Sequence, residues 1–177
     1  MTTEQEQKIE KHDLFFAKLY NDVKIPEKED ENAGLDVYAH FEQETLTIRP
    51  HETIKIPTGI ISAFTKDWVV IFKERGSTGT KGIAQRSGVI DSGYRGEWLV
   101  PITNTSKKRL IITKNKNLLT DEYKNNHKNL IIYDYNKAIC QAVVLSVPKM
   151  KIQEKTVEEI KLISSKRGEG KLGSSGK

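Results

Sequence analysis

The stretch GIISAFTKDWVVIFK (59–73) decides the fold class, because two short runs rich in apolar and β-branched residues flank a polar turn. Similar runs recur on both sides of it, separated by Gly, Pro and Asn, and none sustains helical periodicity over three turns. They are LFFAKL (14–19), TIKI (53–56), EWLVPIT (97–103), RLIIT (109–113), NLIIY (129–133) and ICQAVVLSV (139–147). This pattern predicts an all-β domain built as a sandwich, jelly roll or small barrel.

The length and composition fit one domain of ordinary size. The chain has 177 residues, of which 36% are hydrophobic and 30% are charged, enough for one core but cramped for two. Its single cysteine, Cys140, excludes an intrachain disulfide scaffold and a zinc site built on cysteines, and it fits a reducing compartment. Because the first residues lack signal-peptide features and no apolar run could span a bilayer, we expect a soluble cytoplasmic protein with no membrane partner.

The charge balance is basic, with a formal net charge of +5, which raises the question of nucleic-acid binding. Only six of the 29 basic residues are arginines. The sequence has neither an Arg-rich helix nor basic residues interleaved with aromatic ones, the patterns typical of nucleic-acid binders. The lysine excess is typical of solvated surfaces, so we expect no direct nucleic-acid binding.

Two polar segments interrupt the apolar runs and define the domain organisation. KNKNLLTDEYKNNHK (114–128) lies between two apolar runs, and Thr120 is placed to cap a short helix in it. RGEGKLGSSGK (167–177) is rich in Gly and Ser and has little apolar surface with which to order itself. The sequence predicts a polar tail over 1–13, a β domain over 14–163 with an insert at about 113–134, and a mobile Gly/Ser-rich arm over 164–177.

A Gly/Ser/Thr-rich stretch, ERGSTGTKG (74–82), is the first candidate binding site. Glycines and small hydroxyl residues let backbone N–H groups approach a phosphate, and Arg75 can supply a bidentate fork. The stretch is not a Walker A loop, since Arg75 stands six residues before Lys81, where that motif needs Gly. An ordinary surface turn is the alternative interpretation.

The second candidate is GVIDSGYRGEW (88–98), whose apolar pair, Ser-Gly turn and aromatic residue predict a β-hairpin. Asp91 at its tip suits a carboxylate that orients and deprotonates a water, and Tyr94 offers a flat ring against which a sugar could rest. The alternative is that Asp91 only opens a turn. Neither candidate, taken alone, decides between the interpretations.

Five segments in order resemble the five motifs of the trimeric dUTPase family, over about residues 14–176. The third is a very close match, the fourth matches at Ile139 and Gln141, and the second is looser because Gly76 stands where the family usually has Ser. The segments are AGLDVYA (33–39), RGSTGTKG (75–82), GVIDSGYRG (88–96), KAICQAVV (137–144) and RGEGKLGSSG (167–176). Five ordered motifs are far more specific than any one of them.

The resemblance implies a β-jelly-roll subunit and a homotrimer with three active sites, each assembled from three chains. It implies hydrolysis of dUTP to dUMP and pyrophosphate, which keeps uracil out of DNA and supplies dUMP for thymidylate synthesis. Asp91 would be the catalytic residue that activates the attacking water, and Tyr94 would stack under the deoxyribose. The backbone of Gly88, Val89 and Ile90 would read the uracil edge.

The resemblance also implies contacts to the triphosphate and to a metal. Mg²⁺ would travel on the triphosphate and meet Asp36 through water. The arm would close over the bound nucleotide. The triphosphate contacts would come from Arg75, Gly76, Ser77 and Gln141. The arm contacts would come from Arg167, Leu172, Gly173, Ser174 and Ser175.

The sequence departs from the family pattern in the second motif, in the arm and in the spacing of its motifs. In the second motif, Ser77 would supply the hydroxyl contact that the family's Ser makes one position earlier. In the arm, Leu172 stands where the family has a Phe that stacks on uracil, and the missing stacking contact weakens binding by ~1 kcal/mol. The interval between the third and fourth motifs is long, and the excess falls at about 113–134. A solvated loop is the simplest interpretation, since surface insertions cost little.

Such an insert is a mark of staphylococcal phage dUTPases, which this chain resembles in its Lys/Asn-rich texture. Those proteins double as antirepressors that bind the repressor of a mobile pathogenicity island, and this chain would then act in the host-cell cytoplasm. Two other functions stay open. One is a nucleotide-switched regulatory binding protein with little catalysis. The other is the related dCTP deaminase, which shares the fold, although Tyr94 and the Gly/Ser arm argue against it.

Overall fold

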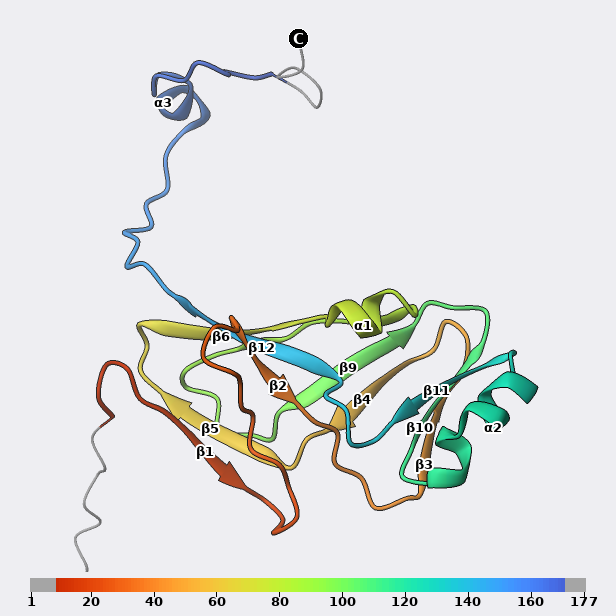
Figure 1. Ribbon diagram of the computed structural model, residues 1–177. Helices are drawn as coiled ribbons and strands as arrows, with labels where there is room; N and C mark the ends of the chain where they lie inside the picture. The colour runs from red at the N-terminus through yellow and green to blue at the C-terminus, as the bar shows by residue number, and fades with distance from the viewer. Residues whose placement is uncertain (1–8, 171–177) are drawn as a thin grey trace, which may run out of the picture. The chain divides into compact units, whose positions relative to one another are not determined.

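The structure is a computed structural model that describes residues 9–170 (Figure 1). It consists mainly of short strands along which buried and more exposed side chains alternate. Strand β9 (Leu99–Asn104) shows the pattern: Val100, Ile102 and Asn104 are buried, whereas the residues between them face outward or are half-buried. This two-residue period is the one expected for a sheet with a single buried face. The predicted all-β class is confirmed, with only short helices among the described residues.

Most of the strands lie in the predicted apolar runs, and those at 34–37 and 83–85 are strands that no such run predicted. The remaining strands are β1 (Leu14–Lys18), β2 (Gly34–Val37), β3 (Thr45–Ile48), β4 (Thr53–Pro57), β5 (Ile60–Phe64), β6 (Trp68–Lys73), β7 (Ile83–Gln85), β8 (Val89–Ile90), β10 (Arg109–Thr113), β11 (Leu130–Asp134) and β12 (Cys140–Ser146). The helices are α1 (Gly76–Gly79), the 3₁₀ helix η1 (Lys116–Leu119), α2 (Asp121–Asn126) and α3 (Val157–Lys161).

Four small sheets arrange these strands, in the orders β1-β5, β11-β10-β3, β2-β12-β6-β8 and β4-β9-β7. Trp98 lies between two of these sheets, because its fully buried ring packs edge-on against Phe16 of β1 and Phe72 of β6, at centroid distances of 5.2 and 5.4 Å. Its indole N–H donates to Ser62 Oγ at 3.0 Å, which satisfies the one polar atom that this ring brings into the core.

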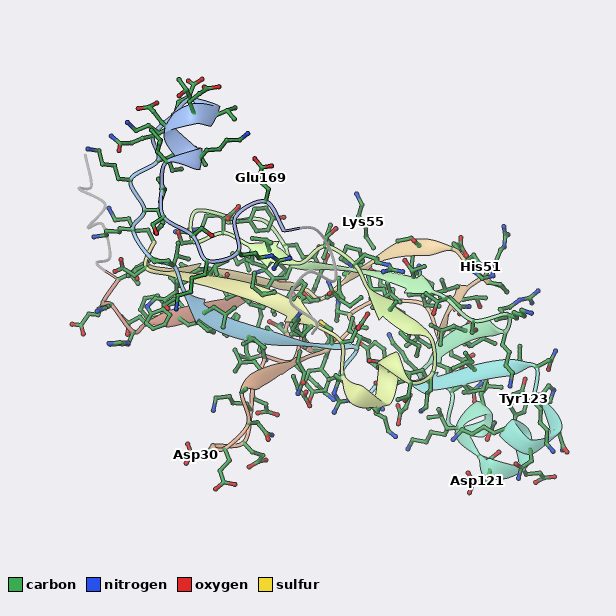
Figure 2. All side chains as sticks on the ribbon, turned by 90° about the horizontal axis from the view of Figure 1, so that it is seen from above. Asp30, His51, Lys55, Asp121, Tyr123 and Glu169 are labelled. Carbon is green, nitrogen blue, oxygen red and sulfur yellow. The ribbon has the colours of Figure 1, made fainter. Side chains whose placement is uncertain are left out.

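The polar segment between β10 and β11 is an ordered crossover. The two strands are parallel, with Ile112 opposite Tyr133, and parallel neighbours need a long connection. That connection contains η1 and α2, which Figure 2 shows beside β11, with Asp121 and Tyr123 of α2 labelled. The predicted cap is confirmed, since Thr120 Oγ1 accepts a hydrogen bond from Tyr123 N at 3.2 Å. The predicted insert at about 113–134 therefore includes the strand β11, and its polar part forms the connection from β10 to β11.

The chain divides into two compact units after Val147, and each is described by itself. The second unit contains α3, which a capping box opens: Thr156 Oγ1 accepts from Glu159 N at 3.1 Å, and Glu159 Oε2 accepts from Thr156 N at 2.8 Å. Within residues 9–170, no helix has the length and apolar character that a membrane crossing requires.

Candidate active site

One sheet carries four of the five predicted motifs. In the order β2-β12-β6-β8, strand β2 holds Asp36, β12 holds Gln141, β6 ends just before Arg75, and β8 is Val89–Ile90 of the third motif. Gln141 lies directly opposite Asp36 on one side and Lys73 on the other. Cross-strand partners point to the same face of a sheet, so segments far apart in the sequence present their polar side chains together.

Arg75 is the centre of the first cluster. Its Nε lies 3.3 Å from Asp36 Oδ1, its Nη2 donates to Asp36 Oδ2 at 3.4 Å, and its Nη1 donates to the carbonyl oxygen of Ala138 at 3.2 Å. Gln141 Nε2 also donates to Asp36 Oδ1, at 3.3 Å. A guanidinium has five N–H groups, and these contacts use three. The other two can meet a phosphate as a fork, and the side chain is 26% exposed, so an anion can reach it.

The stretch after Arg75 forms a short helix, α1, rather than the loop that its glycines and serines suggest. Thr78 is the reason, because its buried side chain donates to Arg75 O at 2.9 Å and accepts from Arg75 N at 3.1 Å. Thr78 therefore closes this turn, and Ser77 stays exposed at the surface. An added Cβ at Gly76 would meet no atom within 4 Å, so this glycine leaves open space beside Arg75.

The second cluster lies in the 88–98 loop, the segment predicted to be a β-hairpin. That prediction is wrong: β8 pairs with β6, whereas β9, which follows the loop, pairs with β4 and β7. The loop therefore joins two sheets, because β8 belongs to the sheet β2-β12-β6-β8 and β9 belongs to the sheet β4-β9-β7. The turn within it is closed by Tyr94 N donating to the backbone oxygen of Asp91 at 3.0 Å, which leaves the exposed Asp91 carboxylate available.

A pocket of about 230 Å³ lies along this loop and is lined by Ser87 through Asp91, by Tyr94 and Glu97, and by Leu99 and Pro101. The Tyr94 hydroxyl donates to Glu97 O at 3.0 Å, and the ring, 43% exposed, lies over Gly96, where an added Cβ would come within 2.4 Å of the hydroxyl oxygen. Val89 is 64% exposed. The pocket therefore offers a flat ring, a free carboxylate and backbone polar groups to a small ligand.

Gly88 fixes the start of the loop. Its φ of +112° lies in the region that favours glycine, and its carbonyl accepts from Phe72 N at 2.8 Å. A Cβ there would lie 2.6 Å from Phe72 Cβ and 2.7 Å from Gln85 Nε2. The glycine is thus required both by its backbone conformation and by close approach to β6.

We expect Gly88→Ala to destabilise the fold by about 3 kcal/mol, from backbone strain and from overpacking against Phe72. At this chain length the unfolding midpoint should fall by roughly 6–12 °C, measured by circular dichroism. Gly93→Ala is the matched control, since a Cβ at Gly93 of the same loop meets nothing within 4 Å. Equal melting temperatures for the two variants would contradict this account of Gly88.

Within one chain the two clusters are separate. The structure brings Asp36, Arg75 and Gln141 together, and it brings Asp91 and Tyr94 together, but β12 and β8 flank β6 on opposite sides. None of the three residues of the first cluster lines the 88–98 pocket.

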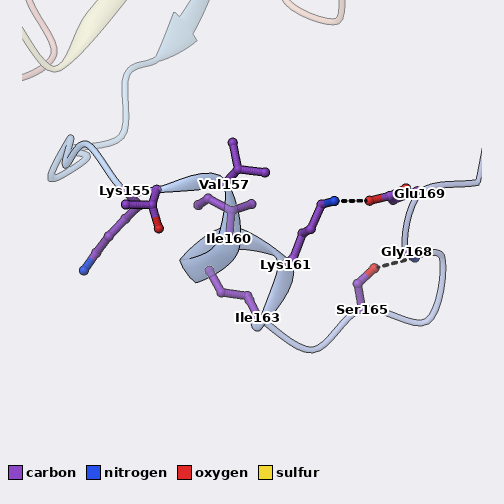
Figure 3. Close-up of a pocket in the computed structure, with 9 residues that line it drawn as sticks. Lys155, Val157, Ile160, Lys161, Ile163, Ser165, Gly168 and Glu169 are labelled. Carbon is purple, nitrogen blue, oxygen red and sulfur yellow. Dashed lines mark hydrogen bonds and ion pairs between the residues drawn. The ribbon is translucent and has the colours of Figure 1, made fainter.

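The arm residues fall in the second unit or beyond the described chain. Arg167 N and Gly168 N both donate to Ser165 Oγ, at 3.2 and 3.1 Å, and Arg167 Nε donates to Gly170 O at 3.3 Å. Figure 3 shows this turn with the Lys161–Glu169 ion pair of 2.9 Å beside it. The predicted contacts Leu172, Gly173, Ser174 and Ser175 lie outside the described residues.

The side chains around Asp36 can be tested for their fit to the magnesium ion that the resemblance implies. Residues 9–170 contain no cluster of three or more His, Cys, Asp or Glu side chains that could hold a metal. Both oxygens of the Asp36 carboxylate already accept hydrogen bonds from Arg75 and Gln141. Such a carboxylate suits contact with a hydrated ion, since Mg²⁺ keeps most of its waters.

Cys140 adjoins Gln141 on β12 but faces the core, where it is fully buried. Burial disfavours the thiolate and raises the pKa of the Cys140 thiol well above its ordinary value. The thiol is thus neither exposed nor ionised at neutral pH, and it contributes packing rather than chemistry.

Comparison with known proteins finds the family that the motifs resemble. The family model for dUTPase matches residues 21–118. A deoxyuridine 5′-triphosphate nucleotidohydrolase of Fusobacterium nucleatum is 30% identical over 159 residues, covering 88% of this chain and 91% of that protein. Relatives of the same name from Desulfitobacterium hafniense are 38% identical over 84 residues, and the match spans 45% of this chain and about half, 55%, of their length.

Solved structures share the fold. The dUTPase of Staphylococcus bacteriophage 80alpha, bound to dUpNHpp, has a TM-score of 0.66 at 21% identity, covering 94% of this chain and 99% of that one. The dUTPase of phage phi11 of S. aureus, described for its species-specific insert, has a TM-score of 0.59 at 19% identity, covering 82% of this chain and 98% of that one. By its motifs, its matched residues and its fold, the chain belongs to the dUTPase family.

Proposed function

We propose that this chain hydrolyses dUTP to dUMP and pyrophosphate. The observation that carries the proposal is the Arg75 cluster, in which a guanidinium is held by Asp36 and by the Ala138 carbonyl with two N–H groups left for an anion. A reaction at phosphorus needs positioning and charge neutralisation more than covalent chemistry. Arg75, exposed Ser77 and the open Gly76 offer both to a triphosphate, and Gln141 stands beside them.

The 88–98 pocket supplies the nucleoside end of the proposed site. Tyr94 stacks under the deoxyribose, and the backbone of Gly88, Val89 and Ile90 reads the uracil edge. A pocket of about 230 Å³ suits a base or sugar rather than a whole nucleotide. Asp91 accepts a proton from the attacking water, a role for which its carboxylate is exposed and free of the turn's hydrogen bond.

We also propose a homotrimer, the assembly that the resemblance implies, in which each site takes its Arg75 cluster and its nucleoside pocket from different chains. Mg²⁺ arrives on the triphosphate, neutralises its charge, and meets Asp36 through water. Arg167 and the residues that follow it close over the bound nucleotide, which shields the reacting phosphates from all but the attacking water.

One incubation tests this function against the alternatives. The purified chain is given dUTP or dCTP with Mg²⁺, and pyrophosphate and ammonia are both followed. Pyrophosphate from dUTP without ammonia from dCTP supports the proposal. Ammonia from dCTP would instead identify a deaminase, and binding of dUTP without turnover would identify a nucleotide-switched regulatory protein. The mass of the assembly in solution tests the trimer.

We propose a second role, binding to the repressor of a mobile pathogenicity island, through the crossover between β10 and β11. The support is analogy: the 80alpha structures are described in terms of phage dUTPases that control transfer of virulence genes. On this chain the crossover presents a stacked pair, Tyr123 and His127, whose ring centroids lie 3.9 Å apart. Such a polar, half-exposed aromatic pair is suited to a protein contact.

Replacing residues 117–126 by Gly and Ser, residue for residue, should weaken repressor binding at least about tenfold while leaving dUTP hydrolysis intact. Replacement is needed because deletion would shorten the connection that lets β11 run parallel to β10. Titration calorimetry with purified repressor measures the affinity, and pyrophosphate release serves as the control. Unchanged repressor affinity would remove the crossover from this contact.

A further inference from the structure

Tyr133 is a buried tyrosine whose hydroxyl shares a hydrogen-bond acceptor with Arg75 of the first cluster. It lies on β11 opposite Ile112, and only 3% of its surface is exposed. Its hydroxyl donates to the carbonyl oxygen of Ala138 at 2.6 Å. That carbonyl is the same one that accepts from Arg75 Nη1 at 3.2 Å. A carbonyl oxygen has two lone pairs, so both bonds can form together.

This shared carbonyl is one of the two groups to which the guanidinium donates within residues 9–170. The other is the Asp36 carboxylate, which takes Nε and Nη2 along one edge of the group. The bond from Nη1 to Ala138 O fixes the opposite end and so sets the rotation of the guanidinium plane. The direction of the two remaining N–H groups therefore depends on where the Ala138 carbonyl points.

We infer that Tyr133 is a positioning residue for Arg75: it holds the Ala138 carbonyl, and the carbonyl aims the guanidinium fork at the phosphate. The phosphate as target rests on the proposed function, whereas the orientation of Arg75 does not. The ring is well suited to the task because it is packed in the core and Lys81 Nζ lies 5.8 Å from its centroid. Tyr133 thus links β11, which follows the crossover, to Arg75, which follows β6.

The Tyr133 hydroxyl is protonated in neutral solution and can donate there. Burial raises the pKa of Tyr133 above its ordinary value, although the polar side chains of Arg75 and Ser77 oppose that rise. The bond to the carbonyl requires the protonated hydroxyl, because a phenolate could not donate to it. The positioning role therefore does not switch off in mildly alkaline solution.

The test is Tyr133→Phe, which keeps the ring and removes the hydroxyl. Arg75 contacts phosphate both before and during reaction, so we expect KM for dUTP to rise about fivefold to tenfold while kcat changes less than about threefold. Tyr135→Phe is the matched control: this tyrosine lies two positions after Tyr133, just past the end of β11, and its ring packs against Phe41 at a centroid distance of 5.0 Å. It should leave both constants unchanged.

A second readout does not depend on catalysis. The chain has six arginines, and the Nε–H resonance of Arg75 is assigned by its loss in Arg75→Lys. In Tyr133→Phe the order parameter of this N–H should fall, and in Tyr135→Phe it should not. The double variant Arg75→Lys/Tyr133→Phe should have the KM of Arg75→Lys alone, because both changes act on one contact.

An ordered Arg75 and unchanged KM in Tyr133→Phe would overturn the inference, as would additive effects in the double variant. If the wild-type chain does not hydrolyse dUTP, the proposed function fails, and the Arg75 resonance still decides whether Tyr133 orders the guanidinium. Thermal melting of each variant confirms that the folded protein is being compared.

Discussion

Asp91→Asn is expected to lower kcat for dUTP by about a thousandfold while leaving nucleotide affinity within a few-fold of the wild type. The amide has the shape of the carboxylate but cannot take a proton from water. The turn should survive, because its closing hydrogen bond uses the backbone oxygen of Asp91 and not its side chain. Pyrophosphate release measures turnover, and calorimetry with a non-hydrolysable dUTP analogue measures binding.

Asp67→Asn is the control for charge. Asp67 also lies in a turn, and its backbone oxygen accepts a hydrogen bond from Val147 N at 2.8 Å. Its substitution by Asn removes the same negative charge from a different turn, outside the 88–98 loop. We expect wild-type kinetics from it. A kcat for Asp91→Asn within about tenfold of the wild type would exclude Asp91 as the proton acceptor.

Deleting residues 167–177 is expected to reduce kcat/KM for dUTP at least about a hundredfold, because the deletion removes the Arg167 charge and the segment that would exclude water from the phosphates. Arg167→Ala in the full-length chain separates the two causes, since it removes only the charge. The measurement is steady-state pyrophosphate release at several dUTP concentrations.

Glu169→Gln controls for an indirect effect of the truncation, which also removes the carboxylate paired with Lys161 at 2.9 Å. This variant should hydrolyse dUTP at the wild-type rate. If the truncated chain itself works normally, the segment is a tail without a role in catalysis.

The sequence predicted the strands well because their apolar runs are short and bounded by turn residues. The runs at 59–64 and 68–73 became β5 and β6, and Thr120 caps α2 as expected. Sheet order could not be read in the same way. Asp36 and Gln141 are separated by 105 positions, and nothing local in either segment shows that they face each other across β2 and β12.

The missed residues share a physical reason. Tyr133 reads as an ordinary core residue of an apolar run, and its contact is to a backbone carbonyl, which has no side-chain signature in a sequence. Thr78 likewise acts through the backbone of Arg75. The hairpin prediction for 88–98 failed because turn chemistry specifies a reversal of direction but not which strand the outgoing segment will join.

The burial of Cys140 makes the chain a ready substrate for site-specific labelling. Since its one native thiol is enclosed in the core and held in the protonated form, maleimide reagents should pass it by under native conditions. A cysteine introduced at an exposed position such as Lys166 would then be the single reactive thiol on the folded protein. A fluorophore attached there could report, in real time and without background, whether nucleotide changes the surroundings of the arm.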